Sequence, residues 1–180
     1  QYLWKTHYPF LRLKMPNHCT NVLHIDGEFH HRQEFVDRNK GFHWGDVEKK
    51  KEYHDLSFHA SVPIPQRIIK AHLKNSSNDE WYRFSNKKWG TKWDCYEISL
   101  DHTDRYTCYS FETAWCPPTE WVVAVSKKYP HLKFNVEWAE EGGEGGNFMY
   151  HGGDCFHEHH FNTQEWRNFM GYEEDENDEW

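Results

Sequence analysis

The stretch CYEISLDHTDRYTCYSFE, from Cys95 to Glu112, decides the fold. Its first part, Cys95–Leu100, places apolar residues at every second position, which is the period of a β-strand with one buried face. The polar residues 101–105 predict a turn, and Tyr106–Glu112 predicts the strand that returns beside the first. The stretch therefore predicts an antiparallel β-hairpin.

The segment after the hairpin predicts a helix and one more strand. Pro117 and Pro118 suit the first turn of a helix, where a missing N–H group costs nothing. An apolar stripe then follows one helix face as far as Pro130, which stops the helix. Residues Leu132–Trp138 alternate between apolar and polar side chains and predict a strand.

The segment before the hairpin predicts a strand and a helix of its own. Asn21–Ile25 predicts a buried strand that ends at a turn signal, and Glu28–Arg38 has apolar residues at near-helical spacing. The order strand, helix, strand, strand, helix, strand is the split βαβ pattern of ferredoxin-like folds. We therefore predict an α+β fold, ferredoxin-like βαββαβ, with a four-stranded antiparallel sheet and helices on one face.

A long insertion separates the first predicted helix from the second predicted strand. Pro63 and Pro65 force an extended connection, and a short helix is predicted over Gln66–Leu73. The aromatic block Trp81–Trp93 follows. We expect its rings to pack against the sheet and to hold the insertion in place.

Composition and charge restrict the possible partners. Aromatic residues make up 18% of the 180 residues, which is enough to build a core from few aliphatic side chains. The net charge is −8, and six acids without a base lie in Glu173–Glu179. The remainder has 21 bases and 23 acids, so no basic surplus favours nucleic acid.

The five cysteines are an odd number and form no CxxC pair. No apolar stretch is long enough to cross a membrane, and no signal peptide is present. The cysteine pattern therefore indicates free thiols, which persist in a reducing compartment. We predict a cytoplasmic protein of the host cell that does not bind membranes.

The pattern divides the chain into four parts. Residues 1–14 lack a periodic apolar pattern and are interpreted as an N-terminal extension or fragment, with the functional chain beginning at Met15. Residues 15–154 form the predicted ferredoxin-like domain. A C-terminal extension with a histidine cluster (155–171) and an acidic tail (172–180) follow.

Several phrases occur together in an order that resembles a known family, the YubB-like ferredoxin-like domains carried by phages and plasmids. The phrases are Met15–Asn21, Val62–Pro65, Trp89–Trp93, Phe111–Pro118 and Ser126–Pro130. The resemblance covers residues 15–154 and departs from the family's usual residues at His18 and Cys116. It implies a ferredoxin-like fold and a mobile-element origin, but no mechanism.

One set of residues is a candidate surface for a ligand or a partner. Trp89, Trp93 and Trp115 suit stacking on a ring, and Lys92 beside them suits a phosphate. The alternative is a packed aromatic minicore that serves only stability.

A second set is a candidate metal site. His151, Cys155, His157 and His159 are ligands that zinc prefers. Cys155, His157 and His159 would share a face on a strand, whereas His151, Cys155 and His159 would align on a helix. The alternative is a group of surface histidines, since the chain has 15 of them. We predict no cofactor, and zinc is the one metal that this cluster would suit.

Three functions follow from these observations. The first is a small non-enzymatic binding protein of a phage or another mobile element, with a host or phage protein as its partner. The second is a metal-dependent hydrolase or nucleotide-handling enzyme that uses the His/Cys cluster. The third is a nucleic-acid-binding module that uses the open sheet face, with Tyr96 and Tyr109 as stacking residues if they face outward.

Overall fold

The structure, a computed structural model, describes residues 17–44 and 53–172. The predicted extension 1–14, the predicted start at Met15 and all but one residue of the acidic tail lie outside the described residues. The strands are β1 (His18–Asp26), β2 (Tyr96–His102), β3 (Thr107–Ala114), β4 (Lys133–Glu140), β5 (Gly145–His151) and β6 (Asp154–His160). The helices are α1 (Phe29–Asn39), α2 (Phe58–Ser61), α3 (Gln66–Lys74), α4 (Glu80–Lys88), α5 (Thr119–Lys128) and α6 (Thr163–Met170).

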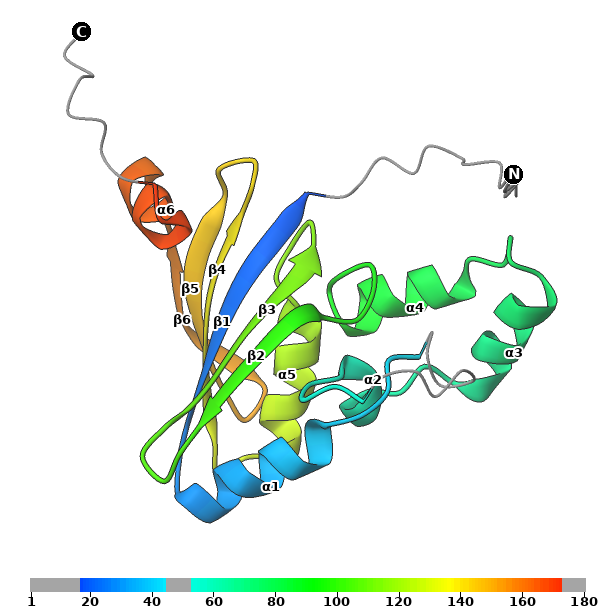
Figure 1. Cartoon of the computed structure of the whole chain (residues 1–180), viewed down its shortest axis with the longest axis horizontal. Coiled ribbons are helices and arrows are strands. Elements are labelled where there is room, and N and C mark those ends of the chain that lie inside the picture. Colours follow the sequence, from blue (N-terminus) through cyan, green and yellow to red (C-terminus); the bar gives the residue numbers. More distant parts are fainter. Residues whose placement is uncertain (1–16, 45–52, 173–180) are drawn as a thin grey trace, which may run out of the picture.

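The predicted ferredoxin-like arrangement is confirmed in the order β1-α1-β2-β3-α5-β4 (Figure 1). β1 lies between β3 and β4, and β2 pairs with the other side of β3. All three pairings are antiparallel. Leu23 of β1 is opposite both Tyr109 and Val136, so these three buried residues share the face that the helices cover. The predicted strand patterns therefore mark the core face in β1, β3 and β4, whereas the register shift between Tyr96 and Ser99 turns Tyr96 of β2 to the open face, away from Leu100.

The sheet has six strands, and the prediction of four is wrong. Its order is β2-β3-β1-β4-β5-β6, so β5 and β6 add a hairpin outside β4. β5 begins with two glycines, and every residue of β6 is exposed. Neither strand therefore has the clean alternation that identified the others. α6 and all of β6 except Asp154 lie within the predicted extension 155–171, and β6 pairs with β5.

Aromatic rings fill the space between the sheet and the two main helices. Phe35 of α1 is fully buried and meets Tyr109, Trp121 and Tyr129 edge-on, with ring centroids 5.2–6.4 Å apart. Such edge-to-face pairs add to the stabilisation from burial alone. The core is thus built from few, large side chains, as the aromatic content predicts.

One buried charge fastens α1 to the β2–β3 turn. Arg32 is 3% exposed and donates hydrogen bonds to the backbone oxygens of Gly27, Thr103 and Asp104 and to the hydroxyl of Thr107. Four acceptors around one guanidinium offset the cost of removing it from water. The arginine therefore fixes the distal end of the hairpin on the helix.

The insertion packs beyond the helix layer as α2, α3 and α4 (Figure 1). The predicted helix 66–73 is confirmed as α3. Phe58 of α2 is fully buried and contacts the rings of Trp89, Phe111 and Trp121, so it joins the insertion to β3 and α5. Across the described ranges, no helix is both long enough and apolar enough to cross a bilayer.

Candidate functional site

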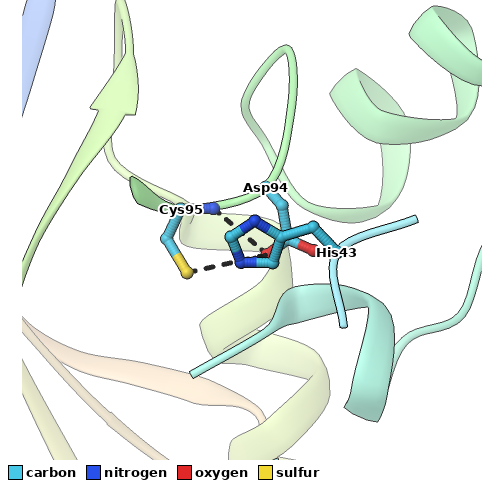
Figure 2. A group of neighbouring side chains, drawn as sticks. All are labelled: His43, Asp94 and Cys95. Carbon is cyan, nitrogen blue, oxygen red and sulfur yellow. Dashed lines mark hydrogen bonds and ion pairs between the residues drawn. The ribbon is translucent and has the colours of Figure 1, made fainter. Parts of the chain in front are cut away.

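Three chemically reactive side chains meet where the insertion touches the start of β2. Their ligand atoms all lie within 4.8 Å of one another, and the residues are His43, Asp94 and Cys95 (Figure 2). Among the described residues, no other group of three or more His, Cys, Asp or Glu side chains lies this close together. We refer to it as the Asp94 cluster.

Asp94 is the centre of this cluster and is only 5% exposed. Its carboxylate accepts hydrogen bonds from the amides of Phe58 (2.6 Å), His59 (3.2 Å) and Cys95 (3.1 Å) and from the Ser57 hydroxyl (3.1 Å). It thus satisfies first-turn amides of α2, a task that an N-cap side chain usually performs. Asp94 therefore clamps the insertion onto the start of β2.

The thiol of Cys95 is not an activated nucleophile. Its Sγ lies 3.6 Å from an Asp94 oxygen and 3.6 Å from the Leu56 carbonyl, both of them acceptors. Burial, with the Asp94 charge as the next cause, raises the pKa of Cys95 well above its ordinary value. A thiolate nucleophile must reach its substrate and have its charge stabilised, whereas Cys95 is fully buried and its thiol faces the Asp94 carboxylate.

The donor set also fits a metal poorly. His43 Nε2 lies 3.3 Å from the Leu56 oxygen and 3.7 Å from an Asp94 oxygen, so we assign the imidazole hydrogen to Nε2. A metal would need that nitrogen's lone pair, the Cys95 thiolate and an Asp94 oxygen, all of which are engaged in hydrogen bonding. The Asp94 cluster is best explained as a structural fastening.

Of the Asp94 cluster, His43 alone lines a cavity of about 670 Å³ beside the outer edge of β2, which we call the edge cavity. His43 belongs to both, and its ring stacks on that of His54 with centroids 3.8 Å apart. The lining residues are His43, Tyr53, His54, Asp55, Tyr96, Glu97, Ile98 and Ser99. The volume lies within the range of small-ligand pockets, which is roughly 300–1,000 Å³.

Glu97 projects from a β-bulge at this cavity. The β2–β3 register shifts between Tyr96 and Ser99, and Glu97 has a φ of 50°, in the left-handed region that non-glycine residues rarely adopt. Bulges redirect side chains near functional sites, and strained backbone clusters there. The exposed Glu97 carboxylate is thus held at the cavity by a backbone that costs energy to form.

The residues of the predicted tryptophan surface lie in two different environments, one in the core and one that reaches the surface. Trp89 is fully buried and donates through Nε1 to the Val62 oxygen at 2.9 Å, so it belongs to the core. The Lys92 ammonium lies 4.7 Å from the Trp93 ring and 5.0 Å from the Trp115 ring, and Trp115 is 41% exposed. Lys92, Trp93 and Trp115 form a cation–π cluster that reaches the surface.

Two backbone features support that cluster. Trp115 has a φ of 69° and donates its amide to the Asn17 oxygen at 3.0 Å. Gly90 has a φ of 83°, and a Cβ there would lie 3.1–3.2 Å from Thr119 and Glu120. The close backbone approach that Gly90 permits explains how the Lys92 loop packs against the start of α5.

The four predicted metal ligands are not brought together. The β5–β6 register places Cys155 opposite Tyr150 but His157 opposite Met149, so a bulge turns Cys155 to the other face from His157. His151 Nε2 lies 3.0 Å from the Pro130 oxygen, and His159 Nε2 lies 3.0 Å from Glu165 Oε1. The shared strand face that the alternation predicted is therefore broken between residues 155 and 157.

The two predicted stacking tyrosines face opposite sides of the sheet. Tyr109 is fully buried beneath the helices. Tyr96 is opposite Glu112 on the open face, and its hydroxyl lies 2.8 Å from His18 Nδ1. Only one of the two rings can therefore serve a ligand on the open face.

Sequence reasoning missed the Asp94 cluster and the edge cavity. His43 and Asp94 are 51 positions apart, with no motif that relates them. The usable signal is local: an aspartate directly before a predicted strand, followed by a cysteine, at the end of an insertion that must be held in place.

Comparison with known proteins identifies the domain. A family model described as the ferredoxin-like domain in Api92-like protein matches residues 88–179, which is 92 of the 180 residues. The match runs from the end of α4 through α6. No curated protein matches the chain.

One solved structure shares the fold. It is the crystal structure of a protein api92 from Yersinia pseudotuberculosis, with a TM-score of 0.52 and 16% sequence identity. The alignment covers 66% of this chain and 45% of that protein, so this chain corresponds to less than half of it. The predicted ferredoxin-like domain is confirmed, while the YubB-like identity stays a prediction. The chain belongs to the family of Api92-like proteins that carry this ferredoxin-like domain.

Proposed function

We propose that this protein is a non-enzymatic binding protein that takes up an extended segment of a partner protein along the outer edge of β2. One observation carries the proposal: four consecutive residues of this edge strand, Tyr96–Ser99, line the edge cavity. An edge strand presents unpaired backbone groups that a further strand can use. In such complexes the backbone supplies affinity, and adjacent pockets select side chains.

The hairpin register indicates which backbone groups of β2 face outward. Thr103 donates its amide to the Tyr106 oxygen at 2.9 Å, and Ser99 is opposite Ser110. Hydrogen-bonded pairs alternate along an antiparallel ladder, so Ser99 and Asp101 direct their backbone groups toward β3. Leu100 and His102 therefore direct theirs toward the outer edge, where the segment would pair.

The cavity favours a segment with a basic side chain. Glu97 is exposed at the bulge, and the side chain of Asp55 is 55% exposed, although Lys40 lies 3.3 Å from it. Tyr53 is 62% exposed and offers a ring at the same cavity. A lysine or arginine beside Glu97 and an apolar residue against Tyr53 would complement these groups.

The partner is a host or phage protein in this proposal. The resemblance to YubB-like domains supports a phage or plasmid origin, and the cysteine content supports the host cytoplasm. The metal-dependent enzyme has less support, because its predicted ligands point to different faces of β6. A nucleic-acid surface has less support as well, because Tyr109 is buried.

The proposal is tested by selecting random 12-residue peptides on the immobilised protein and measuring the affinity of the enriched sequence by calorimetry. We expect enrichment of β-branched, aromatic and basic residues. N-methylation of alternate peptide residues should abolish binding in one register and spare it in the other, because only one set of amides faces β2.

Two protein variants locate the binding. Glu97→Lys should weaken the selected peptide by about tenfold or more, through loss of one charge pair and gain of a repulsion. Glu144→Lys, an exposed glutamate in the β4–β5 connection, is the matched control and should change nothing. Equal binding by both variants, or binding that no pattern of N-methylation affects, would contradict the proposal.

A further inference from the structure

A second cavity lies between α1 and the turn that joins α5 to β4. It has a volume of about 300 Å³, and we call it the α1–β4 pocket. Its lining residues are His31, Glu34, Arg38, Lys128, Tyr129, Pro130, His131 and Leu132. Two permanent cations, two imidazoles and a single carboxylate thus line the pocket, although the net charge of the whole chain is −8.

The geometry of α1 explains why these groups meet. His31, Glu34 and Arg38 are three and four residues apart, so they project from one helix face. The ring of His31 stacks on that of His131 with centroids 4.6 Å apart and an interplanar angle of 16°. The stack fixes the position of the α5–β4 turn relative to α1.

Arg38 and Tyr129 each keep hydrogen-bond donors that their contacts with other described residues do not use. The salt bridge to Glu34 uses Arg38 Nε at 3.1 Å, and within the described residues the terminal guanidinium nitrogens have no partner. Tyr129 is 8% exposed, and its hydroxyl accepts from Asn39 Nδ2 at 3.3 Å, which leaves its own hydrogen available. Burial raises the pKa of Tyr129, so the hydroxyl stays protonated.

We propose that the α1–β4 pocket binds a phosphate dianion, either free or as a small phosphate monoester. Arg38 presents the planar fork that matches phosphate oxygens, and Lys128 adds a second charge. The Tyr129 hydroxyl and the His31–His131 pair supply further donors. Glu34 competes with the anion for Arg38, but both side chains are largely exposed, so their pairing is weak.

The test is calorimetric titration of the full chain with inorganic phosphate and, separately, with O-phosphoserine, at constant ionic strength. Nuclear magnetic resonance of the His31 and His131 rings reports whether the anion occupies this pocket. We expect saturable binding and shifts of both ring signals. If only O-phosphoserine binds, the natural ligand is a monoester, and if both bind equally, phosphate alone is recognised.

Three variants and a control make the outcome decisive. Arg38→Gln and Lys128→Gln should each weaken phosphate by about tenfold, and Glu34→Gln should tighten it about threefold. Lys127→Gln removes a neighbouring exposed lysine that does not line the pocket and should leave affinity unchanged. Binding that sulfate and chloride match, or that Lys127→Gln weakens as much as Lys128→Gln, would overturn the proposal.

Discussion

Replacing Asp94 by alanine tests the view that this residue fastens the insertion. The carboxylate accepts four hydrogen bonds from N–H and O–H donors, and Asp94 is 5% exposed, so the change leaves buried donors without a partner. A hydrogen bond to a charged group contributes about 1.5–3 kcal/mol, but the four share one side chain and do not add fully. We expect a loss of about 4 kcal/mol in the free energy of unfolding, at the upper end for single substitutions.

Two further variants provide reference values for the loss in free energy of unfolding. Asp94→Asn keeps one acceptor oxygen and replaces the other by a donor, so we expect a loss of about 2 kcal/mol. Asp55→Asn removes an aspartate that is 55% exposed and pairs with Lys40, and it should cost about 0.5 kcal/mol. Urea unfolding followed by tryptophan fluorescence and circular dichroism measures all three. An Asp94→Ala protein with the midpoint of the unaltered chain would refute the reasoning.

Three other predictions follow from burial and hydrogen bonding. Trp89→Ala should lower the free energy of unfolding by about 4 kcal/mol, because Trp89 is fully buried. Trp115→Ala should lower it by less than about 1 kcal/mol, because Trp115 is 41% exposed. Similar denaturation midpoints for the two variants would contradict this prediction. Arg32→Met should cost about 3 kcal/mol, since it leaves the carbonyls of the β2–β3 turn without their donor, and hydrogen exchange in that turn should accelerate. Burial lowers the pKa of His59 below its ordinary 6.5. As the pH drops below about 6.5, His59 therefore binds a proton in the unfolded chain more readily than in the folded chain, and the free energy of unfolding should decrease. His59→Asn keeps an acceptor for the Ile64 amide and should reduce that dependence, and an unchanged pH slope would count against it.

The fold was predictable wherever the sequence carries a periodic apolar pattern. β1, β2, β3, β4, α1 and α5 each carry a periodic apolar pattern, and their order alone specifies the ferredoxin-like arrangement. β5 has a buried face as well, but its two glycines and the consecutive apolar residues Phe148–Tyr150 conceal the alternation. β6 has no buried residue, so its pattern contains no period to read. α6 does carry a readable signal, the capping box of Asn162 and Glu165, which marks a helix start.

The candidate site was much less predictable than the fold. The three tryptophans lie in two short motifs, Trp89–Trp93 and Phe111–Pro118, yet Trp89 turns into the core while Trp115 reaches the surface. That difference depends on the positive φ of Trp115 and on the packing of Phe58 against Trp89. The Asp94 cluster and the edge cavity depend on how the insertion folds back onto β2, and contacts across 51 positions leave no local pattern.

Amide hydrogen exchange along β2, with and without the selected peptide, tests strand addition most directly. Leu100 and His102 direct their amides outward, whereas Ser99 and Asp101 pair with β3. On peptide binding, we expect exchange at Leu100 and His102 to slow by about tenfold or more, with little change at Ser99 and Asp101. Bound peptide that leaves the exchange of Leu100 and His102 unchanged would contradict the account.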